Sequence, residues 1–184
     1  LLDDFLADNA FFGAATLLFD PGNFSHGFEG ITGLSAILIT HQHPDHADRE
    51  RLPALLAANP GAALYADPQT AAELGGDWRA VHVGDELTID GLTVRGVGGR
   101  HAVIHPDIPV IDNISYLIGD SGHPARLMHP GDALFVPDEP VEVLAAPAAA
   151  HARRLAEHFG HHRLQRHALG QIVATAAVVG HHEV

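Results

Sequence analysis

The chain has 184 residues, 46% of them hydrophobic and 18% charged, a composition that excludes a disordered segment and allows a real core. It has no cysteine, so disulfides and thiolate metal ligands are excluded, and no apolar run approaches the roughly 20 residues that cross a bilayer. The formal net charge of −13 repels phosphate groups. Since no basic and apolar leader is visible either, we expect a cytoplasmic protein without nucleic-acid or membrane partners, whose oligomeric state stays open.

The first half of the chain alternates between predicted strands and helices. Short apolar runs bounded by turn residues indicate strands. Pro53 stands in the first turn of one helical segment, where proline is tolerated, and Asn59-Pro60-Gly61 ends that segment. The expected elements are strands over residues 14–20, 36–40 and 62–66 and helices over residues 52–58 and 68–74.

From residue 79 the apolar residues recur with a period of two, as in strands whose two faces differ. The alternating residues are Val81, Val83, Leu87, Ile89, Leu92 and Val94. Asp90-Gly91 is a strong signal for a two-residue hairpin turn. Further strands are expected over residues 114–118, 126–128, 141–144 and 172–179. Strands that alternate with helices and also form hairpins favour an α/β or α+β arrangement of layers.

The most informative segment is His41-Gln42-His43-Pro44-Asp45-His46, which directly follows the apolar run of residues 36–40. Pro44 prevents the strand from continuing, so this polar cluster belongs on a loop at the end of the strand. Imidazole nitrogens and carboxylate oxygens are ligands that zinc accepts. The segment therefore predicts a metal site, and the alternative is a solvated turn in a chain with 16 histidines.

Four motifs together resemble the signatures of the metallo-β-lactamase fold superfamily. Besides the histidine segment, they are Asp20-Pro21-Gly22, Gly98-Gly99-Arg100-His101-Ala102 and His129-Pro130-Gly131-Asp132-Ala133. The branch they are most similar to contains ascorbate-phosphate lactonases and related hydrolases. The resemblance implies an α/β (α+β) four-layer αββα sandwich in a single domain over residues 1–184. Its motif-bearing core covers about residues 14–147, with a glycine-rich loop before His101, while the tail of residues 148–184 is atypical and both ends depart from the family pattern.

The resemblance also implies a site for one or two metal ions, with zinc expected and manganese or iron suited by the same donors. The implied ligands are His41, His43 and His101 for the first ion, Asp45 and His46 for the second, and Asp132 as the bridge between them. Asp45 would also accept the proton of the attacking water, which makes it the expected catalytic residue. His181 is the candidate for a last ligand of the second ion, because it follows an apolar run, although a frayed terminus is the alternative.

Other polar residues near these motifs are given less specific roles. Asp20, at a strand end, is expected to orient a ligand through hydrogen bonds instead of binding metal. His105 and Asp107 either line the substrate mouth or belong to a solvated loop. His129 is expected to be a surface or packing residue, and Asn113 receives no role.

These residues predict a metal-dependent hydrolase in which a metal-bound hydroxide attacks a small ester, lactone or phosphodiester. The expected partner is therefore a small-molecule substrate. The alternative is a truncated or altered relative that binds metal with little or no catalysis, which the departures at both ends of the chain favour. The substrate itself is not specified, since specificity in this fold depends on the loops around the site.

Overall fold

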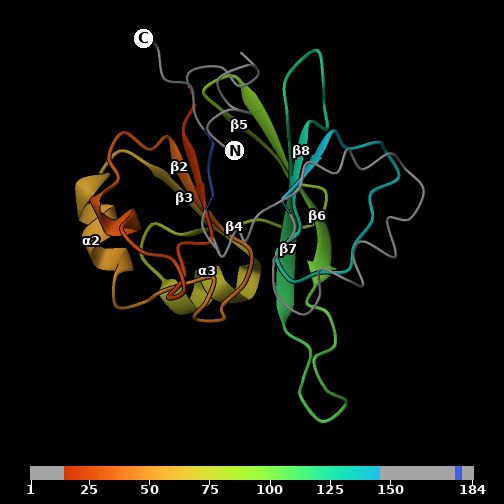
Figure 1. The fold of residues 1–184 in the computed structure, drawn as a ribbon, viewed down its shortest axis with the longest axis horizontal. Helices are drawn as coiled ribbons and strands as arrows, with labels where there is room; N and C mark the ends of the chain where they lie inside the picture. Colours follow the sequence, from red (N-terminus) through yellow and green to blue (C-terminus); the bar gives the residue numbers. More distant parts are fainter. Residues whose placement is uncertain (1–14, 146–176, 180–184) are drawn as a thin grey trace.

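The computed structural model describes residues 15–145 and 177–179, which form two packed β-sheets (Figure 1). The first sheet has the order β10-β1-β2-β3-β4, parallel from β1 to β4, with β10 antiparallel at its edge. Its strands are β1 (Leu17–Phe19), β2 (Ala36–Ile39), β3 (Ala63–Ala66), β4 (Arg79–Ala80) and β10 (Ala177–Val179). This order places β1 and β2 in the middle of the sheet, where both faces are covered.

The second sheet has the order β5-β6-β7-β8-β9 and is antiparallel except for the β8–β9 pair. Its strands are β5 (Glu86–Ile89), β6 (Leu92–Arg100), β7 (Asp112–Gly119), β8 (Leu127–His129) and β9 (Val143–Leu144). The turn between β5 and β6 consists of Asp90 and Gly91, whose φ angles of 46° and 88° fit the left-handed conformation that such hairpins need.

The helices cover the face of the first sheet that lies away from the second sheet (Figure 1). They are the 3-10 turn η1 (Phe28–Gly30), α2 (Leu52–Ala58) and α3 (Pro68–Leu74). The carboxylate of Asp67 caps α3 by accepting hydrogen bonds from the backbone N–H groups of Gln69 and Thr70. In the described part of the chain, no helix is long and apolar enough to cross a membrane.

Two apolar layers arise from the alternation of side chains along the central strands. Leu17 and Leu38 point into the core between the two sheets, whereas Leu18 and Ile37 point into the core under α2. Because both faces are covered, β2 is apolar at every position, as is typical of a buried parallel strand. These layers hold the end of β2 in a fixed place.

The two sheets are joined by hydrogen bonds where β2 ends. The backbone N–H of Ile114 on β7 donates to the carbonyl of Thr40 at 2.9 Å, and the hydroxyl of Tyr116 donates to the carbonyl of Ile39 at 3.0 Å. All of these groups are buried, so the bonds satisfy atoms that would otherwise be costly to desolvate. The residues that follow Thr40 therefore emerge directly beside β7.

The predicted helices over residues 52–58 and 68–74 are confirmed at both ends, and the hairpin at Asp90-Gly91 is also confirmed. Two details of the prediction are wrong. Val81 and Val83 lie after β4 and outside any strand. They do not share one face, since Val81 packs into the core between the sheets while Val83 is exposed. The predicted glycine-rich loop is the end of β6, which stays paired with β7 as far as Arg100.

The metallo-β-lactamase-like α/β fold is confirmed, and the described residues supply three of its expected layers: helices, sheet and sheet. In residues 15–145 the outer face of the second sheet is covered not by a helix but by a small apolar cluster. Its buried members are Leu117, Ala125 and Met128. Apart from β10, the tail after residue 145 and the first 14 residues lie outside the described residues.

The hairpin turn gives a test of the fold. We expect Gly91→Ala to lower the free energy of unfolding by about 1–2 kcal/mol, because the φ of 88° is unfavourable for a residue with a Cβ. Chemical denaturation monitored by circular dichroism would measure this. Gly61→Ala is the matched control, since a Cβ at either glycine meets no atom within 4 Å but Gly61 has no positive φ. Equal losses in the two variants would contradict the assigned turn.

Candidate metal centre

The histidine segment forms a tight loop at the end of β2. β2 ends at Ile39, Pro44 lies in the turn that follows, and the backbone N–H of His46 donates to the carbonyl of His43 at 2.9 Å, which turns the chain back. The backbone of Gly22 packs directly against this loop. A Cβ at that position would lie 1.7 Å from the carbonyl oxygen of Asp45, so a larger residue would not fit. The Asp-Pro-Gly motif is thus required for close packing against the histidine loop.

Three imidazoles from two sheets converge at this loop. One possible ligand atom from each of His41, His43 and His101 lies within 4.8 Å of the others. The rings of His41 and His43 are T-shaped with centroids 4.7 Å apart, and the His101 ring lies 4.8 Å from each of them. His41 and His101 are buried, whereas His43 is partly exposed. The group has the donors and the compactness of a site for one cation.

The hydrogen bond between His41 and Thr40 leaves the other ring nitrogen of His41 with a lone pair. Its Nδ1 lies 3.1 Å from Oγ1 of Thr40, and this hydroxyl already donates to Asp20. The hydroxyl therefore accepts the Nδ1–H of His41, and Nε2 keeps its lone pair. That Nε2 lies 3.0 Å from Nδ1 of His43. Two neutral ring nitrogens at this distance need a shared proton or a shared cation between them.

His101 also presents a free ring nitrogen to the centre. Its Nδ1 donates to the carbonyl of Ala102 at 2.6 Å, which leaves the lone pair on Nε2. Among the described residues this buried Nε2 has no hydrogen-bond partner, although Oδ2 of Asp132 lies 3.4 Å away. A buried polar atom without a partner is costly, and a cation bound among these imidazoles would satisfy it.

A second trio shares His41 and adds His46 and Asp132, again with ligand atoms within 4.8 Å of one another. Nε2 of His46 lies 3.6 Å from Oδ1 of Asp132 and 3.7 Å from Oδ2 of Asp45. Asp132 therefore lies between His46 and His101, with one carboxylate oxygen near each. This is the position expected of a group that bridges two cations.

Asp20 is buried behind the second trio and is the centre of its hydrogen bonds. Its Oδ2 accepts from Nδ1 of His46 and from Nε2 of His129, both at 2.7 Å. Thr40 donates to the same carboxylate through its hydroxyl at 2.8 Å and its backbone N–H at 2.7 Å. Because Nδ1 of His46 is committed to Asp20, Nε2 is the atom that faces Asp132. Asp20 thus orients His46 through a hydrogen bond, the kind of contact that its position in the sequence predicted.

The loop that carries Asp132 is fixed by Asn113 on β7. The side-chain amide of Asn113 donates to the carbonyl of Pro130 at 3.0 Å, and its oxygen accepts from the backbone N–H of Asp132 at 3.0 Å. Gly131, with a φ of 57°, lets this loop approach β2, since a Cβ there would lie 2.6 Å from Thr40. The loop therefore cannot move far from the histidine segment.

The electrostatics of the centre differ from one imidazole to the next. Burial and the nearby charge of His46 lower the pKa of His41 to about 2, and burial together with His101 also lowers the pKa of His43. Both rings are therefore neutral at pH 7. Burial acts the same way on His46, but the carboxylates of Asp20 and Asp132 outweigh it and raise its pKa to about 9.

The carboxylates stay ionised in spite of burial. Burial alone would raise the pKa of Asp20, but the imidazoles of His46 and His129 reverse this and hold it well below its ordinary value. Burial also opposes ionisation of Asp132, and His101 and His46 overcome it to lower the pKa to about 2. The metal-free centre therefore balances buried negative charge with protonated histidine.

The structure brings together six of the predicted site residues and leaves one unplaced. Those that converge are His41, His43, Asp45, His46, His101 and Asp132. His181 lies outside the described residues. Two residues were missed: His129, expected at the surface or in packing, is a buried partner of Asp20, and Asn113 holds the Asp132 loop. The signal for His129 was its place at the end of an apolar strand, as for His41.

Comparison with known proteins places this architecture in a family. Residues 5–159 match the profile of the Beta-lactamase superfamily domain. The chain belongs to the metallo-β-lactamase superfamily. The chain is similar to Protein Rv0786c from Mycobacterium tuberculosis (strain ATCC 25618 / H37Rv). The two sequences are 75% identical over 146 residues, which are 79% of this chain and 69% of that protein.

Two solved structures share the fold of this chain at low identity. A proposed metal-dependent hydrolase from Parabacteroides distasonis has a TM-score of 0.60 at 20% identity, covering 79% of this chain and 70% of that one. CmlA, a diiron beta-hydroxylase from Streptomyces venezuelae, has a TM-score of 0.51 at 17% identity, covering 83% of this chain and 35% of that one. At these identities the likeness supports the fold and not the activity.

The carboxylate of Asp20 should set the metal affinity of the centre without touching the metal. We expect Asp20→Asn to weaken Zn²⁺ binding about 10–100-fold, because His46 loses the acceptor that orients its ring. Competition with a chromophoric chelator would measure the affinity. Asp85→Asn is the control. The exposed carboxylate of Asp85 pairs with His82, so its replacement leaves all contacts of the centre intact. Unchanged affinity in Asp20→Asn would contradict the assigned role.

Metal uptake should release protons, since His46 with a pKa of about 9 is protonated near pH 7.5 and must lose its Nε2 proton to become a ligand. We expect the affinity for Zn²⁺ to rise with pH up to about 9. The metal-free protein should instead lose stability between pH 6.5 and 9, because the folded state binds more protons than the unfolded state in that window.

Calorimetric titration in two buffers of different ionisation enthalpy counts the released protons, and thermal melts of metal-free protein from pH 6.5 to 9 follow the stability. His82→Ala removes an exposed histidine and should leave both measurements unchanged. Zinc binding at pH 7.5 without proton release would show that His46 is not a ligand.

Proposed function

We propose that this chain is a metal-dependent hydrolase whose centre binds two divalent cations, with zinc as the expected ion. The proposal depends above all on Nε2 of His101, a buried ring nitrogen that has no hydrogen-bond partner among the described residues and lies near the imidazoles of His41 and His43. Imidazoles and carboxylates suit zinc, and manganese or iron accept the same donors. The residues present therefore fit the group that the family implies.

The two trios indicate how the ligands would be divided. His41, His43 and His101 would hold one cation. Asp45 and His46 would hold the other, and Asp132 would contact both, since its two oxygens face His46 and His101. Bound cations at this site would supply hydroxide at neutral pH and positive charge beside the oxyanion that develops during hydrolysis.

The chain's own side chains would manage the proton and the geometry of the reaction. Asp45 lies at the open side of the centre with 34% of its side chain exposed, where it can accept a proton from the attacking water. The water oxygen then bonds to the carbonyl carbon or phosphorus, the ester bond breaks, and Asp45 returns the proton to the leaving alkoxide. Asp20 keeps His46 in place throughout, because it is buried and fully hydrogen-bonded.

The substrate class we propose is a small ester, lactone or phosphodiester. The resemblance to ascorbate-phosphate lactonases stays a prediction, and it places a lactone in the set of compounds to test. The alternative, a relative that binds metal with little catalysis, is favoured by one observation: the second trio shares His41 with the first, so the described residues offer fewer donors to the second cation. Metal stoichiometry distinguishes the two functions.

Two active-site variants test hydrolysis directly. With zinc-loaded full chain and a panel of p-nitrophenyl acetate, γ-butyrolactone and bis(p-nitrophenyl) phosphate, we expect turnover of at least one compound. His101→Ala and Asp132→Asn should lower kcat/KM about 100-fold or more, because each removes a ligand from the centre. His82→Ala, an exposed histidine outside the centre, is the control. Equal rates for the wild type and Asp132→Asn on every compound would contradict the proposal.

Metal analysis of the same samples completes the test. Two cations per chain support the hydrolase, and one cation supports the metal-binding alternative. His181→Ala tests the candidate for the last ligand: a count that falls from two to one would assign it to the site, and an unchanged count of two would remove it. Parallel loading with Mn²⁺ and anaerobic Fe²⁺ identifies the ion that supports turnover.

A further inference from the structure

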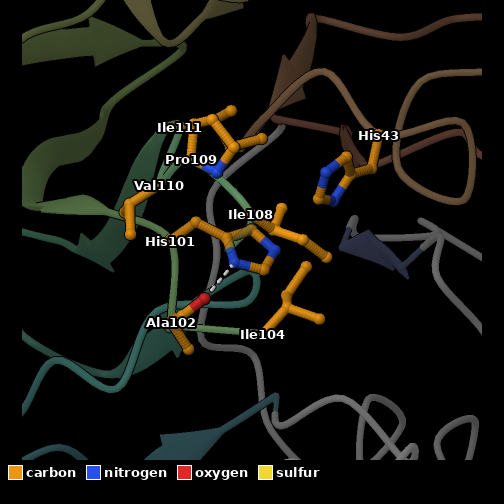
Figure 2. A pocket seen from close by; sticks show the side chains of 8 residues that line it. All are labelled: His43, His101, Ala102, Ile104, Ile108, Pro109, Val110 and Ile111. Carbon is orange, nitrogen blue, oxygen red and sulfur yellow. Dashed lines mark hydrogen bonds between the residues drawn. The ribbon is translucent and has the colours of Figure 1, made fainter. Parts of the chain in front are cut away.

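A small apolar pocket opens directly beside the candidate metal centre. Its volume is about 230 Å³, and two of its lining residues are His43 and His101. Figure 2 shows the side chains of Ile104 and Ile108 beside the His101 ring, on the side that faces His43. The remaining lining residues are Ala102, Pro109, Val110 and Ile111. A group that fills this pocket would therefore contact the side chains that we propose as metal ligands.

The apolar wall of the pocket belongs to the connection between β6 and β7. This connection is closed at its base, where the backbone N–H of His101 donates to the carbonyl of Ile111 at 3.1 Å. It is folded again near its tip, where the N–H of Ile108 donates to the carbonyl of His105 at 3.0 Å. Backbone hydrogen bonds at both places define the position of the isoleucines.

Two large apolar side chains on this connection are exposed to solvent. Ile104 is 52% exposed and Ile108 is 49% exposed. Large apolar surface that is exposed in one place beside a polar site commonly marks a contact for a ligand. The polar residues His105 and Asp107 lie away from the pocket, since their side chains are 60% and 90% exposed and neither lines it.

Among the described residues that line the pocket there is neither Arg nor Lys, and the chain as a whole carries a net charge of −13. A phosphate or carboxylate could be neutralised only at the metal centre, not in the pocket. An aliphatic or aromatic group, by contrast, would be desolvated there against isoleucine, valine and proline.

We propose that this pocket binds an uncharged apolar substituent next to the bond that is hydrolysed, so that the preferred substrates are esters or lactones with a short alkyl or aryl group. The identification of that bond rests on the proposed function. The volume of about 230 Å³ lies below the roughly 300–1,000 Å³ of pockets that enclose drug-sized ligands, so the substituent contains few carbon atoms.

A chain-length series tests the preference. With zinc-loaded full chain and p-nitrophenyl acetate, butyrate and hexanoate, we expect kcat/KM to rise about fourfold per added methylene until the pocket is filled. A flat or falling series overturns the proposal. So does faster turnover of bis(p-nitrophenyl) phosphate than of the hexanoate ester, because the pocket cannot favour an anion.

Variants locate the preference in the pocket. Ile104→Asn and Ile108→Asn should bring the ratio of kcat/KM for hexanoate over acetate close to one, because each replaces apolar lining with an amide. Val83→Asn is the matched control, since Val83 is also exposed, at 59%, but does not line the pocket, and its ratio should stay at the wild-type value. A ratio that changes equally in all three variants overturns the assignment.

A binding experiment separates failure of the pocket from failure of the hydrolase. Full chain labelled at the isoleucine δ1 methyl groups is titrated with 1-hexanol and followed by NMR spectroscopy. We expect shifts at Ile104, Ile108 and Ile111 and none at the core residues Ile37 and Ile39. Such shifts without turnover of any ester would contradict the proposed function and keep the pocket assignment. Unshifted pocket methyls overturn the pocket whatever the activity.

Discussion

The buried carboxylate of Asp20 is the contact on which the candidate centre depends. A charge without exposure to water is tolerated only when it is paired and hydrogen-bonded, and Asp20 accepts from Thr40, His46 and His129. These partners come from the end of β2, from the histidine loop and from the end of β8. One carboxylate therefore connects both sheets to the imidazole of His46.

The candidate metal centre and the apolar wall of the neighbouring pocket are formed by different parts of the chain. The candidate ligands follow buried strands and are packed against glycines, as at Gly22 and Gly131. The pocket wall stands on the connection between β6 and β7, which carries exposed isoleucines. If the proposed function holds, the centre would supply the reaction and the connection would select the substrate.

Much of the site could be predicted because its signals are local. His41 and His43 stand two residues apart just after the apolar run, and Pro44 marks the turn that follows wherever the rest of the chain lies. The boundaries of α2 and α3 and the turn at Asp90-Gly91 likewise follow from neighbouring residues. The ligand assignments across the chain came from the family resemblance, and the structure brings those side chains together.

The sequence by itself thus determined the histidine loop, the two helices and the hairpin, since each depends on backbone preferences within a few residues. Only the tertiary structure decided which histidines share a hydrogen-bonding partner, as His46 and His129 share Asp20. Asp20 and His129 are 109 residues apart, and the bond between them exists because the packed sheets bring the end of β1 next to the end of β8. The pocket was decided in the same way: the apolar residues after His101 acquire a role only because the packed sheets bring His43 to face them.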